Sequence, residues 1–229
     1  MFNTRAVAWL ALVNNVEQAI PEIVTKVINF TKDSDPEGTG GYFGLKNLKE
    51  ASFLVGPMLA GEVNDDRKSS LLLKNCLEMA NRLISTNERY KHISSHQSRE
   101  PQNGKYGGAI IGADDNSCKC VLVFSGLLTE HANETIALLV AVEVGLLTEE
   151  QAAGIAQISG NTIYFEIIKS ANKQSSQELA DDVSDVFSPP ECNKIALMDQ
   201  DSALKYIVEQ LPRYGISNPE KYLEAKDIL

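Results

Sequence analysis

The residues that could bind a ligand gather at one predicted junction between a strand and a helix. Ser125 and Gly126 end a short apolar run, and Thr129 precedes a stretch whose apolar residues recur at helical spacing. At the start of a helix the backbone N–H groups lack partners within the helix and carry the positive end of its dipole. Such N–H groups can bind a carboxylate, phosphate or propionate group, so we predict an anion site at this junction.

Two side chains in the first turns of this helix extend the predicted site. His131 and Glu134 are three residues apart and therefore share one face of the helix. His131 lies off the predicted buried stripe, so we expect it to be partly exposed. The predicted ligand-binding residues are thus Ser125, Gly126, Thr129, His131 and Glu134. The alternative is that Thr129 only caps the helix and the charged side chains face solvent.

The other histidines and the cysteines are weaker candidates for a metal site. His92 and His96 are four residues apart, which is ligand spacing on a helix, but the residues between them form helices poorly. Cys118 and Cys120 would share one face of a strand, yet a metal site needs two further ligands. Burial as small apolar side chains is the other interpretation of these cysteines. We therefore predict no metal site.

No catalytic motif accompanies these candidates in the sequence. Ser125 lacks the preceding glycine of the nucleophile elbow found in serine hydrolases. The four glycines between positions 104 and 112 do not form a loop that opens a helix, as nucleotide-binding fingerprints require. The sequence therefore favours binding over catalysis and predicts no catalytic residue.

Composition limits the classes of protein to which the chain can belong. Of its 229 residues 43% are apolar, which is enough for a hydrophobic core. It carries 31 acidic against 21 basic side chains, a net charge of −10, which disfavours binding to nucleic acid. No apolar run reaches the roughly 18 residues of a membrane-spanning helix. The apolar run from Ala6 to Val13 continues as a helical pattern, which favours a cytoplasmic protein over a secreted one.

The spacing of apolar residues predicts the elements that hold the site. The ranges 106–113 and 118–124 form a predicted β-hairpin, and the second strand is apolar on both faces, as a central strand is. Helices are expected over 67–86 and 130–145, both on one face of the sheet. Residues 162–169 alternate as a third strand would, with a helix as the alternative.

The two ends of the chain are predicted to be helical. A helix is expected over 4–31, kinked or broken into two at Pro21, and another over 45–60. Polar and acidic residues make 171–201 similar to a linker, and two short helices are expected after it. The predicted regions are an N-terminal helical region (1–60), an α+β core (61–170), an acidic linker-like segment (171–201) and C-terminal helices (202–229). The predicted fold class is α+β: a small, mainly antiparallel sheet flanked by helices, with the N-terminal helical region added to it.

Charge is divided unevenly along the chain. Residues 71–112 contain six basic and three acidic side chains, whereas 113–201 contain four basic and fifteen acidic ones. Two oppositely charged surfaces that attract each other in the folded chain would explain this division. The alternative is an acidic face that binds a basic protein partner, as in an inhibitor, immunity or adaptor protein.

The predicted hairpin resembles that of a known family. The run Tyr106-Gly107-Gly108-Ala109-Ile110-Ile111-Gly112, a turn and then Val121-Leu122-Val123-Phe124-Ser125-Gly126 is similar to the hairpin of the small GlcG and HbpS-like haem-binding family. In that family the helix that follows the hairpin has acidic residues in its first turn. Glu130 and Glu134 are the corresponding residues here. The resemblance covers about 30 residues and implies a profilin-like antiparallel sheet flanked by helices, with small-ligand binding and no catalysis. It assigns no haem ligand to any position.

These observations favour one function and leave two alternatives. The favoured function is a soluble, non-catalytic domain that binds or senses a small molecule where the strand ending at residue 124 meets the helix beginning at 130. The alternatives are an acidic module that binds a basic protein and an enzyme with a dispersed site. Neither nucleic acid nor a membrane is an expected partner, and the sequence identifies no cofactor.

Overall fold

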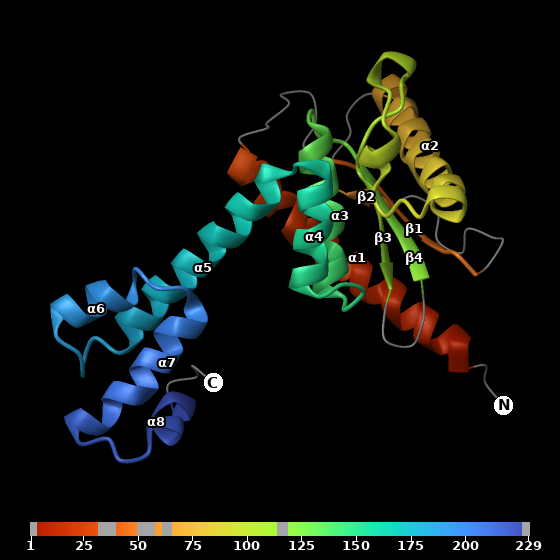
Figure 1. The fold of residues 1–229 in the computed structure, drawn as a ribbon. Helices are drawn as coiled ribbons and strands as arrows, with labels where there is room; N and C mark the ends of the chain where they lie inside the picture. The colour runs from red at the N-terminus through yellow and green to blue at the C-terminus, as the bar shows by residue number, and fades with distance from the viewer. Residues whose placement is uncertain (1–3, 32–39, 50–57, 61–65, 114–118, 226–229) are drawn as a thin grey trace. The chain divides into compact units, whose positions relative to one another are not determined.

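The computed structural model describes residues 4–31, 40–49, 58–60, 66–113 and 119–225. The chain divides into a first unit, Met1–Phe165, and a second unit, Glu166–Leu229. Helices and a small antiparallel sheet make up the described part of the first unit, and helices make up that of the second (Figure 1). The predicted α+β fold class is therefore confirmed.

The sheet of the first unit has four described strands, all paired in antiparallel fashion. Their order across the sheet is β2 (Met58–Ala60), β1 (Gly41–Asn47), β4 (Lys119–Ser125) and β3 (Ala109–Ala113). β3 and β4 form the predicted hairpin, and β4 is central as expected, because it pairs with β1 as well as β3. The predicted turn between these two strands lies outside the described residues.

Each face of the sheet is covered by a helix. α2 (Asp66–Tyr90) covers one face, where its buried side chains pack against Val121 and Val123. Since side chains alternate along a strand, Leu122 points to the opposite face, on which α3 (Glu130–Glu143) packs (Figure 1). The prediction that both helices lie on one face is therefore wrong. A strand that is apolar on both faces needs a covering element on each side.

α3 occupies a central position in the first unit. Besides the sheet, α1 (Thr4–Thr31) and α4 (Glu149–Ser159) pack against it, and every residue from Ala132 to Leu138 is buried. Thr129 caps α3 and Thr148 caps α4, both as predicted. Polar side chains of α3 can therefore contact several elements at once.

α1 is a single helix although Pro21 lies inside it. Proline removes one backbone hydrogen bond, here the one to the carbonyl of Glu17. Pro21 and Glu17 are both exposed, so water can bond to that carbonyl. The opposite side of α1 is buried, at Val16, Ile20 and Ile23. The predicted alternative of two separate helices is therefore wrong.

The prediction of a helix over 45–60 is wrong. The prediction that the N-terminal region is purely helical is therefore also wrong. Residues Gly41–Asn47 form β1, which lies inside the sheet. Phe43 and Leu45 are both fully buried, and their separation of two is the period of a strand. Residues 50–57 lie outside the described part, and β2 follows them.

Residues 162–169 begin helix α5 (Thr162–Asp182), so the predicted strand is wrong and the helical alternative is confirmed. Asn161, the residue before the helix, caps it: its side-chain Oδ1 accepts the N–H of Tyr164 at 3.3 Å. Tyr164 and Ile167 are buried three residues apart, which is helical spacing. The β-branched and aromatic residues here are used for packing, which overrides their preference for strands.

The second unit has a helical core, so the linker predicted over 171–201 is wrong. Leu179, Val183 and Phe187 recur every four residues and are buried, while the acidic side chains between them are exposed. The helices after α5 are α6 (Pro189–Ile195), α7 (Gln200–Gln210) and α8 (Pro219–Ala225), the last two as predicted. The core also contains Ala180, Ile195, Ala196, Ala203, Ile207, Leu211 and Leu223.

Short 3₁₀ helices complete the described elements, at Ser95–Ser98 (η1), Pro101–Asn103 (η2) and Leu211–Tyr214 (η3). η1 lies in the segment that connects α2 to β3. Among the helices that the structure describes, none combines the length and apolar character needed to cross a membrane.

Candidate functional site

The junction between β4 and α3 is closed by hydrogen bonds of its own. Asn133 Oδ1 accepts the N–H groups of Gly126 and Leu127 at 3.2 and 2.9 Å, and Asn133 Nδ2 donates to the Leu127 carbonyl at 3.1 Å. Thr129 Oγ1 accepts a further N–H of the first turn at 3.2 Å. Ser125 and Gly126 are themselves buried. The N–H groups of Gly126, Leu127 and Ala132 at this junction are thus already bonded within the protein.

Glu134, the last of the predicted site residues, is fully buried in the interior of the first unit. Its Oε1 is hydrogen-bonded to the hydroxyl of Ser94, just before η1. Its Oε2 accepts the hydroxyl of Ser159 at 2.5 Å and the side-chain amide of Asn161 at 3.1 Å, both at the end of α4. One carboxyl group therefore connects α3 with two other segments of the chain.

His131 lies beside Glu134 on α3, as the spacing predicts, and is half-buried. Its Nε2 is 3.2 Å from the carbonyl oxygen of Ser159, and its ring centroid is 4.9 Å from that of His96. Glu130 Oε2 is 3.8 Å from His96 Nδ1. We call these side chains the buried polar cluster; its members are Ser94, His96, Glu130, His131, Glu134, Ser159 and Asn161.

His96 is packed too tightly for a ligand to reach its outer nitrogen. Its Nε2 is buried and has no hydrogen-bond partner among the described residues. A Cβ placed on Gly107 would lie 2.1 Å from this nitrogen, so the ring rests directly on the glycine backbone. The N–H of Gly107 donates to Glu130 Oε2 at 2.7 Å, which holds this segment against α3. The histidine therefore packs the interior and leaves no space for a metal or substrate at Nε2.

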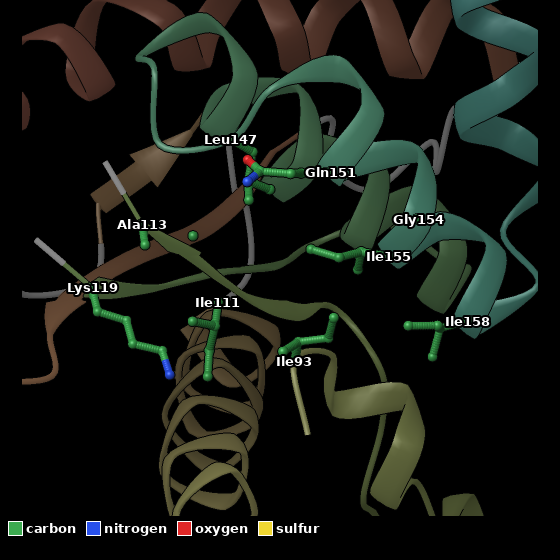
Figure 2. A pocket seen from close by; sticks show the side chains of 10 residues that line it. Ile93, Ile111, Ala113, Lys119, Leu147, Gln151, Gly154, Ile155 and Ile158 are labelled. Atoms are coloured by element: carbon green, nitrogen blue, oxygen red, sulfur yellow. The ribbon is translucent and has the colours of Figure 1, made fainter. Parts of the chain in front are cut away.

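A separate groove opens between β3 and α4 (Figure 2). It encloses about 420 Å³. Its floor and walls come from the edge strand, from Ile93 before η1 and from one side of α4. The residues that line it are Ile93, Ile111, Gly112, Ala113, Lys119, Leu147, Gln151, Gly154, Ile155 and Ile158. Most of these are apolar, which is the usual character of a small-molecule site.

The groove has two polar side chains. Lys119 Nζ donates to Asn87 Oδ1 at 3.1 Å. Gln151 Oε1 accepts the N–H of Thr148 at 2.9 Å as part of the α4 capping box. The side-chain N–H₂ of Gln151 is not used in that bond and is available to a ligand.

The edge of the sheet beside the groove is already covered. The N–H of Ile111 donates to the Ile93 carbonyl at 2.9 Å, and the N–H of Ala113 donates to the Leu146 carbonyl at 2.7 Å. The N–H of Ala109 donates to a serine hydroxyl of η1 at 2.9 Å. Adding a peptide strand to a sheet requires unpaired backbone groups along the edge. The bonded N–H groups of β3 therefore favour a small molecule over an extended peptide as occupant of the groove.

The buried polar cluster and the groove share their supporting segments. Ser94 follows the groove residue Ile93, and Ser159 follows Ile158. Because Glu134 bonds to both serines, its carboxyl group ties one wall of the groove to the other. The sequence placed His131 and Glu134 together correctly, but it gave no sign of the groove, whose residues come from five separate segments.

No group of three or more histidine, cysteine, aspartate or glutamate side chains suited to a metal ion occurs among the described residues. His92 contacts the ring of Tyr90 at 5.7 Å between centroids. Cys120 is buried in β4 and forms no disulfide bond with another described cysteine, and Cys118 lies outside the described residues. His92 and His96 do not lie on one α-helix, because α2 ends at Tyr90.

No protein-family model matches the chain, and neither a curated protein nor a solved structure is similar to it. The resemblance of the hairpin to the GlcG and HbpS-like family therefore stays a prediction. The antiparallel hairpin and its flanking helices are compatible with the fold that the resemblance implies. The function has to be argued from the geometry of the first unit itself.

The stability of the folded chain should depend on pH through His96. Burial lowers the pKa of His96 below its ordinary value of 6.5, outweighing Glu134 and Glu130, which raise it; His131 and Arg99 lower it further. The unfolded chain then binds more protons than the folded chain once the pH falls below 6.5. We therefore expect the free energy of unfolding to fall as the pH is lowered through this range.

Urea unfolding from about pH 7.5 to about pH 5.5 measures this dependence. In the variant His96→Asn the loss of stability over the same interval should be smaller than in the wild type. Equal losses in the two proteins would contradict the assignment of the effect to His96.

Proposed function

We propose that the first unit is a non-catalytic small-molecule-binding domain and that its site is the groove between β3 and α4. The single observation that carries this proposal is the groove itself, about 420 Å³ in volume and lined mainly by apolar side chains. Ligand sites commonly have volumes of roughly 300–1,000 Å³ and combine apolar walls with a few polar groups. Lys119 and Gln151 are the polar groups here.

The walls of the groove are held in place before a ligand arrives. Glu134 bonds to Ser94 on one side and to Ser159 on the other. Arg82 of α2 donates to the carbonyl oxygens of Ser95 and Ser98 at 2.8 and 2.9 Å, which fixes η1 on α2. A preformed site loses less conformational entropy on binding, which supports a binding role for this region.

The positions of the acid and base side chains favour binding over catalysis. Glu134 is fully buried and fully hydrogen-bonded, and His96 has its outer nitrogen against Gly107. A general acid or base must come within hydrogen-bond reach of the substrate. These groups lie behind the groove wall and serve to position it, while the groove lining has no carboxyl, imidazole or thiol group.

Equilibrium binding of the uncharged dye N-phenylnaphthylamine tests the proposal, because its fluorescence rises in apolar surroundings. We expect the wild type to bind the dye and Gly154→Leu to bind it more than about tenfold more weakly. A Cβ on Gly154 meets no atom within 4 Å, so this groove-lining position has open space for a larger side chain. Leucine also favours a helix over glycine by about 0.5–1 kcal/mol, so the variant should melt no earlier than the wild type.

The matched control is Gln157→Leu, which adds the same side chain at an exposed position of α4 outside the groove lining. It should bind the dye as the wild type does. Absence of dye binding by the wild type, or equal binding by Gly154→Leu, would overturn the groove as the site.

A further inference from the structure

We infer that the ligand of the groove is a small amphipathic monoanion, an apolar body with one carboxylate group that is held by Lys119. This inference rests on the proposed function of the groove. It adds the chemical class of the ligand and its orientation, with the carboxylate at Lys119 and the apolar body towards Ile158. Figure 2 shows Lys119 near the Ala113 end of the groove and Ile158 at the other end.

The charge of the groove lining carries the first step. Among its 10 residues Lys119 is the one with an ionisable side chain, and no acidic side chain lines the groove. Within the described residues, the ammonium group of Lys119 forms no ion pair, and its hydrogen bond goes to the neutral amide of Asn87. An ammonium group that lies beside an apolar surface and forms no ion pair with the described residues favours an anionic group on the ligand.

The second step is that Lys119 is held in place rather than free to turn into solvent. Asn87 is largely buried, and its Nδ2 donates to the His92 carbonyl at 2.6 Å. The other amide atom of Asn87, Oδ1, accepts a hydrogen bond from Lys119 Nζ at 3.1 Å. Lys119 and Ile111 both line the groove (Figure 2). An ammonium group fixed in this way loses little freedom when it binds a carboxylate.

The third step concerns the rest of the ligand. Ile93, Ile155 and Ile158 continue the groove away from Lys119, and the Ile158 side chain is about half exposed, at 53%. Their apolar surface suits a hydrocarbon chain or an aromatic ring. Lys119 is the one cation in the groove lining, and one lysine balances one negative charge. A monoanion therefore fits this groove better than a phosphate dianion.

Two dyes with the same ring system separate charge from apolar contact. Anilinonaphthalene sulfonate carries one negative charge, and N-phenylnaphthylamine has none. We expect Lys119→Met to weaken binding of the sulfonate about tenfold and to leave binding of the uncharged dye unchanged. Lys119→Arg should restore most of the affinity for the sulfonate, and Lys74→Met, at an exposed position on α2, should change neither dye.

Displacement of the uncharged dye extends the test to carboxylates. Octanoate should displace it from the wild type at a lower concentration than octanol does, and Lys119→Met should remove this difference. If octanoate and octanol compete equally, or if Lys119→Met leaves the affinity for the sulfonate unchanged, the monoanion inference is overturned. In that case, weaker binding of both dyes by Gly154→Leu would still support the groove as the site. If Gly154→Leu has no effect on either dye, the proposed function fails instead. Melting curves of every variant show that the chain remains folded.

Discussion

Replacing Leu122 with aspartate is expected to leave little or no soluble folded protein. Leu122 is fully buried at the centre of β4, opposite Ile110 on one neighbouring strand and Leu45 on the other. An unpaired carboxylate at this position would have no hydrogen-bond donor and would be removed from water. The loss should exceed about 4 kcal/mol, which is most of the stability of a typical domain.

The soluble fraction after expression and the thermal transition of any soluble material measure this effect. Leu128→Asp is the matched control, because Leu128 lies in the same part of the chain and is 74% exposed. It should give the yield and melting temperature of the wild type. A Leu122→Asp protein that melts like the wild type would contradict the central position of β4.

The second large effect is expected from Glu134→Ala. The substitution removes the acceptor of the Ser94 hydroxyl and one of the acceptors of the Ser159 hydroxyl and the Asn161 amide, and it also opens a cavity in the interior. The combined loss should be roughly 2–4 kcal/mol in the free energy of unfolding. Because Glu134 ties the two walls of the groove together, affinity for the uncharged dye should fall as well.

Chemical unfolding of three variants tests this role. Glu134→Gln keeps the shape of the side chain and one acceptor oxygen, so its free energy of unfolding should lie between those of the wild type and Glu134→Ala. Glu143→Ala removes an exposed carboxyl group from the same helix and should change stability by less than about 0.5 kcal/mol. If Glu134→Ala unfolds at the same urea concentration as Glu143→Ala, the buried polar cluster does not hold the walls of the groove.

Elements with strong local patterns were predictable from the sequence. β4 is apolar on both faces and proved central, and Thr129 and Thr148 start helices because their hydroxyls accept N–H groups of the first turn. The errors arose where tertiary contacts decide between two local possibilities. Residues 162–169 have the composition of a strand, yet the side chain of Asn161 starts a helix there.

The candidate site was predictable only in part, for a physical reason. His131 and Glu134 share a helix face, and helical spacing alone places them together. Their partners Ser94 and Ser159 are 40 and 25 residues from Glu134 in the chain, so the sequence contains no local signal of the contact. The groove is equally non-local, since Ile93 and Ile158 meet only when η1 and α4 pack together.

Mapping the bound dye onto the backbone tests the central claim most directly. Amide chemical shifts of nitrogen-labelled protein would be recorded during titration with N-phenylnaphthylamine. The proposed function predicts that the largest changes occur at groove residues such as Ile93, Ile111 and Gly154, with smaller ones at Ser94 and Ser159 behind them. Changes confined to the second unit, Glu166–Leu229, or to the junction at Ser125 and Gly126, would contradict the groove as the binding site.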